Sequence, residues 1–226
     1  MAGGKIYRDW VDVTPSEAYE LFLKDPDSFS TSAPSPEECY QVFQKAARKA
    51  PNILCVTVSR RLSRVYDSAV DAIELIQGET PGTEVTILDS MQATSSEGMI
   101  ALAAARAAAE GKDLMEAARA AEEVVKKVHT IAFLDTIKHV YRSGRIPKIA
   151  SQLGTMLNIK PILTVAETVH FKGMARSRKK GTERIMEMMV EKVNGRPIRA
   201  SVTHAYAPEE AEQMKERIAK KFNCVE

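Results

Sequence analysis

The sequence predicts a doubly wound α/β layer structure followed by a second, smaller α/β domain. Strands and helices alternate along the first half of the chain, as they do in proteins built around a parallel sheet. Residues 52–59, NILCVTVS, form an almost unbroken apolar run rich in β-branched residues, which is typical of a strand covered on both faces. The alternation loosens after Val128, and 226 residues with 44% hydrophobic content suffice for two modest cores. We therefore expect one domain over residues 1–128 and another over 129–226.

Two helices are predicted before the first strand. The segments TPSE at 14–17 and SPEE at 35–38 each pair a capping hydroxyl with a glutamate three residues later, and each has proline at the first helical position. They predict helices over about 15–23 and 36–50.

The remaining elements follow in order. The first domain continues with a helix that has Tyr66, Ala69, Ile73 and Ile76 on one face, a strand at 83–90, and helices at 96–110 and 113–128, of which the alanine-rich one ends at Gly111. For the second domain the sequence predicts a strand at 129–135, a short helix, the loop RSGRIPK, a helix near 149–157 and an extended stretch at 158–171, where Pro161 suits an edge strand or a strand start. A helix at 178–193, a strand at 198–206, a helix from Pro208 with Met214, Ile218 and Phe222 on its apolar face, and a beginning strand at NCVE complete the order.

Composition excludes several classes of function. Thirty-two Lys and Arg against 30 Asp and Glu leave a net charge of +2, which gives no broad basic field for non-specific nucleic-acid binding. The cysteines are odd in number and widely spaced, at Cys39, Cys55 and Cys224, which fits neither a disulfide framework nor a zinc site. We therefore expect a reduced, cytoplasmic protein. No segment is apolar enough to span a bilayer or to act as a signal peptide.

The common catalytic motifs are also missing from the sequence. The histidines have no metal-ligand spacing, and no glycine loop matches the Walker or dinucleotide patterns, so we expect no metal and no nucleotide cofactor. The histidines are His129, His139, His170 and His204.

Hydroxyl side chains gather in SFSTSAPSPEE at 28–38. Ser35 is explained as a helix cap. Thr31 and Ser32 stand just before that helix start, where free N–H groups and a partial positive charge could hold an anion.

Ser63, in SRRLSRVYDSA, follows the strand at 52–59, and open α/β sheets bind their ligands at this end of a strand. The alternative is that Ser63 merely caps a helix beginning at Arg64. The serine lacks the flanking glycines of a nucleophile elbow and has no histidine near it in sequence, which disfavours an acyl hydrolase.

Cations gather in FKGMARSRKKGTER, at the start of the long helix, where they oppose the helix dipole. This placement fits an anion or an acidic partner surface, and a solvated basic face is the alternative. The cations are Lys172, Arg176, Arg178, Lys179 and Lys180, and Arg142 and Arg145 could add to the same field on either side of Gly144, which ends a helix.

Six segments in collinear order, TSAPSPEE, SRRLSRVYDSA, ILDSMQATSSEGMIALAAARAAAEG, SGRI, LGTMLNIKPIL and ARSRKKG, together resemble the DegV family of fatty-acid-binding proteins. The resemblance implies a Rossmann-like parallel-sheet domain and a smaller two-layer α/β domain, with one long-chain fatty acid held between them. It also implies a role as the acyl carrier of a bacterial fatty acid kinase. The family's usual opening strand and its C-terminal segment, which carries a histidine, are not matched, so we expect a truncated or divergent member.

The resemblance implies roles for individual residues. Thr31 and Ser63 would bind the fatty acid carboxylate. We expect the neighbouring Ser32 to join them, and Arg64, which departs from the family's glycine, to pair with the carboxylate in place of the missing histidine. Arg176 would help present the lipid to the kinase, with Arg178 and Lys179 beside it as docking residues.

We therefore expect a lipid carrier that performs no chemistry, has no cofactor or metal, and contacts membranes at most transiently. The alternative is an interaction or regulatory module with a vestigial pocket, in which the RSRKK face does the binding.

Overall fold

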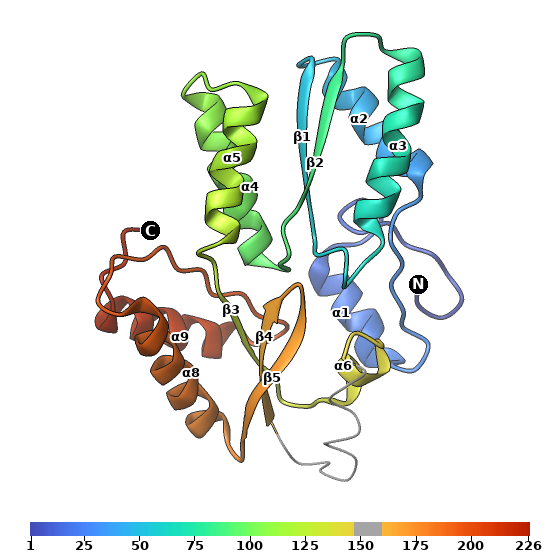
Figure 1. Ribbon diagram of the computed structural model, residues 1–226. Helices are drawn as coiled ribbons and strands as arrows, with labels where there is room; N and C mark the ends of the chain where they lie inside the picture. The colour runs from blue at the N-terminus through green and yellow to red at the C-terminus, as the bar shows by residue number, and fades with distance from the viewer. Residues whose placement is uncertain (147–159) are drawn as a thin grey trace. The chain divides into compact units, whose positions relative to one another are not determined.

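The computed structural model describes residues 1–146 and 160–226, which pack as two compact units (Figure 1). The first unit joins Met1–Ser32 to Val190–Glu226, and the second comprises Ala33–Met189. The domain boundary predicted after Val128 falls inside the second unit, and it stays a prediction.

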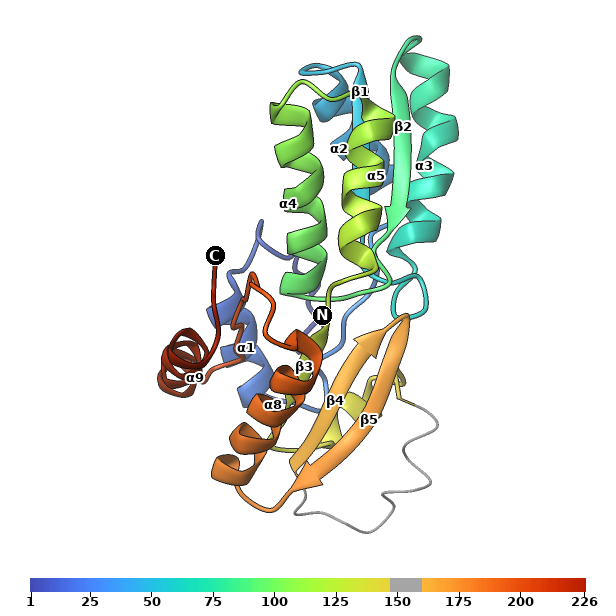
Figure 2. The same ribbon diagram turned by 60° about the vertical axis from the view of Figure 1, so that its left-hand side comes forward.

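A parallel pair of strands lies at the centre of one half of the second unit. Strand β1 (Asn52–Thr57) pairs with β2 (Glu84–Asp89) in the register that places Asn52 opposite Glu84. Helices cover both faces of the pair, with α2 (Pro36–Ala47) and α3 (Val65–Glu79) on one side and α4 (Ser95–Ala109) and α5 (Leu114–Val125) on the other (Figure 2).

Alternation along β1 divides the apolar side chains between two cores. Ile53 and Cys55 pack against the buried residues of α2 and α3, whereas Leu54 and Val56 pack against those of α4 and α5. Successive strand residues point to opposite faces, so a strand covered on both sides needs an unbroken apolar run. The prediction from NILCVTVS is confirmed.

The alanine-rich helix packs closely, as its sequence predicts. Ala104 and Ala107 of α4 and Ala121 of α5 are buried, and small side chains let the two helix backbones approach. Gly111 has a φ of +83° after the end of α4, a conformation that favours glycine, and Asp113 then opens α5 with a capping box.

An antiparallel sheet forms the other half of the second unit, in the order β3-β4-β5. Ala132 and Leu134 pack with Leu163 and with residues of α6, while the intervening Phe133 meets Gly181 of α8. The elements are β3 (Thr130–Phe133), α6 (Lys138–Arg142), β4 (Lys160–Ala166), β5 (Thr168–Ala175) and α8 (Arg178–Val193).

Aromatic side chains join the two chain segments of the first unit. The Tyr19 ring on α1 (Pro15–Lys24) stacks on Tyr206, which precedes α9 (Pro208–Lys221), with ring centroids 4.9 Å apart. Phe22 contacts both Tyr19 and Phe29.

The predicted fold class is confirmed: the protein is a mixed α/β structure with a parallel sheet and a separate antiparallel sheet. Pro161 lies at the second residue of β4, which fits the predicted strand start, although β4 is the middle strand. The helix predicted near 149–157 lies outside the described residues.

The strand predicted at 198–206 is wrong. Only Ile198 forms a bridge, to Cys224. The Ala200 N–H also donates to the main-chain carbonyl of Glu226 at 2.9 Å. Residues 201–206 form no ladder pair with any residue that the structure describes, and β propensity without pairing does not make a strand.

Candidate functional site

Buried polar residues mark one region of the second unit. Within the described part of the chain, the polar side chains that are buried all lie at the carboxyl ends of β1 and β2 or just beyond them. They are Thr57, Ser59, Ser90, Gln92 and Ser96. Burying polar groups is unfavourable unless they are hydrogen-bonded, and open α/β sheets bind ligands at this edge. We therefore take this edge as the candidate site.

Ser59 is the centre of the hydrogen-bond network at this edge. Its side chain is fully buried, and its hydroxyl donates to the carbonyl of Glu167 at 2.5 Å and accepts from the N–H of Arg61 at 3.2 Å. Its own N–H donates to the carbonyl of Gln92 at 2.8 Å. Ser59 therefore ties the loop after β1 to the loop after β2 and to the turn between β4 and β5.

Three residues around this network hold strained backbone conformations. Met91, Thr94 and Glu167 have φ values of +53°, +63° and +59°, a region that costs free energy for residues with a side chain. The Glu167 N–H donates to the carbonyl of Met91 at 2.8 Å, so two of the strained residues hold each other. Such strain persists only where the surroundings fix it, and it concentrates at functional sites.

Ser63 lies at the outer end of the loop that Ser59 anchors. The N–H groups of Leu62 and Ser63 donate to the Ser59 carbonyl at 2.9 and 3.1 Å. The Ser63 side chain is half-buried, and its hydroxyl makes no hydrogen bond to any residue that the structure describes. This hydroxyl is available to a ligand.

The start of α3 corrects the capping alternative for Ser63. Arg64, not Ser63, occupies the N-cap position, and no side chain caps this helix. The first N–H groups of α3 therefore keep their partial positive charge beside Ser63. By contrast, α1, α2 and α5 are closed by capping boxes at Thr14, Ser35 and Asp113.

Arginines surround the Ser63 loop. Arg145 donates from Nε to the carbonyl of Leu62 at 3.2 Å and from Nη1 to the carbonyl of Ser143 at 2.6 Å. Arg60 is partly neutralised, because it pairs with Asp67 at 3.4 Å. Arg64 is exposed. The sequence suggested Arg145 only as an addition to the basic run at 172–180, and no local motif indicated its contact with Leu62.

Thr31 and Ser32 belong to the first unit, whereas Ser63 and Arg64 belong to the second, so a joint role for the four stays a prediction. Ser35 caps α2, which confirms its predicted role. The hydroxyl of Ser28 accepts from the N–H of Gly3 at 3.2 Å. Thr31 and Ser32 are exposed, and neither hydroxyl is hydrogen-bonded within the described ranges.

The predicted docking residues differ in their surroundings. Arg178, in the first turn of α8, pairs with Asp135, whose carboxylate also binds Lys160; both contacts are 2.5 Å long. Hydrogen bonds from these two cations lower the pKa of Asp135 to about 2. Arg176 and Lys179 are exposed and form no ion pair within residues 1–146 and 160–226.

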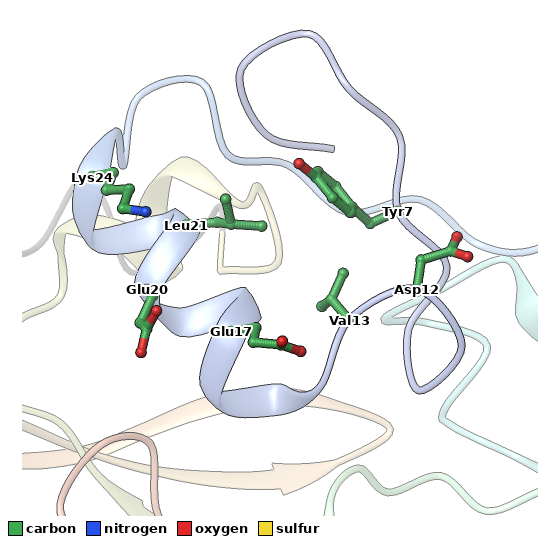
Figure 3. Close-up of a pocket in the computed structure, with 7 residues that line it drawn as sticks. All are labelled: Tyr7, Asp12, Val13, Glu17, Glu20, Leu21 and Lys24. Carbon is green, nitrogen blue, oxygen red and sulfur yellow. The ribbon is translucent and has the colours of Figure 1, made fainter.

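A small pocket in the first unit does not suit an anion. Figure 3 shows it between α1 and the N-terminal loop, lined by Tyr7, Asp12, Val13, Glu17, Glu20, Leu21 and Lys24. It encloses about 180 Å³, and its acidic side chains outnumber its one lysine. Arg8 lowers the pKa of Asp12 to about 2, which keeps that carboxylate charged.

No catalytic or metal site stands out in the described residues. They contain no cluster of His, Cys, Asp and Glu that could hold a metal ion, and no imidazole or carboxylate is hydrogen-bonded to Ser63. His170 instead supports the β4–β5 turn, with Nε2 3.0 Å from the carbonyl of Ala166. The three cysteines are free, and burial raises the pKa of Cys55 to about 11. None of the helices in the described ranges is long and apolar enough to cross a bilayer.

Comparison with known proteins gives consistent matches. A DegV domain-containing protein of Clostridium perfringens is 28% identical over 222 residues, which are 97% of this chain and 78% of that protein. A structure concerning fatty acid binding by a DegV family protein of Thermus thermophilus is 31% identical, with a TM-score of 0.87 over 100% of this chain and 80% of the other. DegV of Bacillus subtilis, a fatty acid binding protein, is 25% identical with a TM-score of 0.87 over 99% and 79% of the two chains.

The family model gives the same assignment. The model of the DegV family, which is described as a family of uncharacterised proteins, matches residues 1–226, the whole of this sequence. The TM-scores of 0.87 show that the matched structures share the fold of this chain. The chain belongs to the DegV family.

Proposed function

We propose that this protein binds a long-chain fatty acid and places its carboxylate against the Ser63 hydroxyl. The observation that carries the proposal is the Ser63 hydroxyl, which has no hydrogen bond to any described residue and lies beside an uncapped helix start, at the end of a loop whose main-chain N–H groups are all hydrogen-bonded. The fatty-acid-binding DegV relatives support the ligand class.

The charges around Ser63 favour an anionic head group. A carboxylate that leaves water must be met by donors, and the Ser63 hydroxyl and the first N–H groups of α3 are donors of this kind. Arg64 adds a cation that a glycine could not supply, and it stands at the N-cap of the same helix. On the resemblance, we assign Thr31 and Ser32 to the same carboxylate.

The alkyl chain would supply most of the affinity. Each buried methylene contributes about 0.8 kcal/mol, so a long saturated chain exceeds the contribution of a few hydrogen bonds to the head group. The hydroxyls then fix which end of the lipid faces the partner. In this proposal the protein is a cytoplasmic carrier that leaves the lipid chemically unchanged.

We also propose that Arg176 and Lys179 dock a partner kinase that acts on the bound lipid. Neither side chain has an ion-pair partner in the described part of the chain, whereas Arg178 is held by Asp135. Lys179 lies in the first turn of α8 and Arg176 just before it, where cations are unfavourable, so an anionic partner surface would relieve this repulsion.

The head-group assignment is tested by binding measurements on single variants. Ser63→Ala and Thr31→Val should each weaken palmitate binding by about 1.5–3 kcal/mol, the contribution of a hydrogen bond to a charged group. Because both hydroxyls would contact one carboxylate, the double variant should differ from the sum of the singles. Ser68→Ala, one turn further along α3, is the matched control and should bind like the wild type. Unchanged affinity in both test variants would refute the assignment.

The docking assignment needs a different readout. Arg176→Ala should abolish acyl phosphate formation with a fatty acid kinase while palmitate binding survives. If Arg176→Ala costs as much palmitate affinity as Ser63→Ala, the arginine belongs to the lipid site and the docking assignment is wrong. A protein that binds the kinase but no lipid would favour the interaction module instead.

A further inference from the structure

We propose that Ser59 and the backbone of Glu167 form a lock that positions Ser63 for the head group of the ligand. This inference rests on the proposed function. It gives Ser59 a positioning role, in which Ser59 acts through Ser63 and not by touching the lipid. The lock is defined by two hydrogen bonds: Ser59 Oγ to the Glu167 carbonyl at 2.5 Å, and the Glu167 N–H to the Met91 carbonyl at 2.8 Å.

Every hydrogen-bonding group of Ser59 is used within this region. Its hydroxyl serves Glu167 and Arg61, its N–H serves Gln92, and its carbonyl accepts from Leu62 and Ser63. The Ser59 side chain has no exposed surface, so water cannot easily replace a lost hydrogen bond, and the unbonded partner would cost free energy. The Ser59 carbonyl orients the Ser63 N–H, and the Ser59 side chain is itself held by the turn between β4 and β5.

Glu167 provides the opposite side of the lock. It stands alone between β4 and β5, because Ala166 pairs with Thr168, and its φ of +59° turns the main chain so that its N–H and its carbonyl reach two different loops. Both contacts use main-chain atoms, so the lock depends on the conformation at residue 167 and not on the glutamate side chain.

The loop after β2 completes the restraint. The carboxylate of Asp89 accepts from the N–H groups of Met91 at 2.9 Å and Arg60 at 3.3 Å, so it holds both neighbouring loops. With these contacts in place, Ser63 has a fixed main chain and a hydroxyl that bonds to none of the residues the structure describes. This combination gives a preorganised donor, which loses little conformational freedom when a carboxylate binds.

The first arm of the test is hydrogen exchange on the ligand-free protein. In Ser59→Ala the amides of Leu62 and Ser63 should exchange faster than in the wild type, because their acceptor carbonyl is no longer fixed. Tyr40→Phe is the matched control: it removes another hydroxyl contact, to Glu79, between α2 and α3, and should leave those amides unchanged. Unchanged exchange in Ser59→Ala would overturn the lock even if the protein binds fatty acids.

The second arm compares palmitate with hexadecanol, which has the same chain length but no carboxylate. Ser59→Ala should lower palmitate affinity about three- to tenfold and leave hexadecanol affinity unchanged, since only an oriented charge-binding donor is lost. Glu167→Gly keeps the main-chain contacts and should retain the wild-type ratio of the two affinities. An equal loss for both ligands would show that Ser59 merely supports the fold, which overturns the positioning role. A wild-type protein that binds neither ligand would overturn the proposed function as well, while the exchange arm still decides whether the lock exists.

Discussion

Asp135 should stabilise the junction of β3, β4 and α8 through its two cations. The perturbation is Asp135→Asn, which keeps the size of the side chain and removes its charge. Lys160 and Arg178 both lie 2.5 Å from the carboxylate oxygens, and their hydrogen bonds lower its pKa from an ordinary 3.8 to about 2. The same substitution leaves two cations facing each other without a counter-charge.

The expected magnitude follows from the pKa. A fall from 3.8 to about 2 corresponds to about 2.5 kcal/mol when the full pair energy reaches the folded state. The Asp135 side chain is 48% exposed, so solvent screening reduces the expected loss to about 1 kcal/mol. Because the folded-state pKa is depressed, this stabilisation is present above about pH 4 and disappears as the pH falls toward 2.

Urea unfolding of the wild type and Asp135→Asn at pH 7, 4 and 2.5 measures this contribution. The two free energies of unfolding should differ at pH 7 and converge at the lowest pH, and added salt should reduce the difference. Equal stabilities at pH 7, or a difference that persists unchanged at pH 2.5, would refute the reasoning. Asp12→Asn is the control for losing a carboxylate of similarly low pKa elsewhere in the protein, because the pKa of Asp12 is also lowered to about 2 and this residue lies in the first unit.

Further variants test the packing and the charge assignments. Gly181→Ala should destabilise the protein by about 1–3 kcal/mol, because a Cβ there overlaps the Phe133 ring. Gly78→Ala, in an open helical position, should be neutral or stabilising by up to about 1 kcal/mol. The denaturant midpoints of the two variants test both expectations. Arg178→Ala should lower the free energy of unfolding as Asp135→Asn does. In the same assay Arg176→Ala should leave it unchanged or raise it by about 0.3 kcal/mol. A large loss of stability in Arg176→Ala would show that this arginine has a structural role. Glu167→Gly should raise the melting temperature, since glycine adopts a φ of +59° without the penalty paid by glutamate, and a lower melting temperature would show that the glutamate side chain contributes.

Local patterns predicted many of the described elements, but the single extended stretch predicted at 158–171 is instead two strands, β4 and β5, which are separated by Glu167. Capping boxes located the starts of α1 and α2, and the apolar run of β1 indicated a strand with helices on both faces. Helix ends were less accurate: the helix predicted to reach residue 50 ends at Ala47, because helix termini fray and no glycine fixes the stop. The strand predicted at 198–206 failed because pairing depends on a partner that a local pattern does not contain.

The site was predictable only in part. Ser63 was a candidate because it follows a buried strand, a position that sequence can identify, and its role in binding stays a prediction. Ser59, Glu167 and the contact of Arg145 with Leu62 were missed, because they depend on contacts across 83 to 108 residues of chain. Glu167 in particular acts through its main chain, so no side-chain motif could have indicated it.

Native mass spectrometry of protein purified from cells tests fatty acid binding most directly. We predict an added mass that matches a long-chain fatty acid, lost on delipidation and regained after incubation with palmitate or oleate. Consistent absence of any lipid, with no uptake of either added fatty acid by folded protein, would contradict the proposed function.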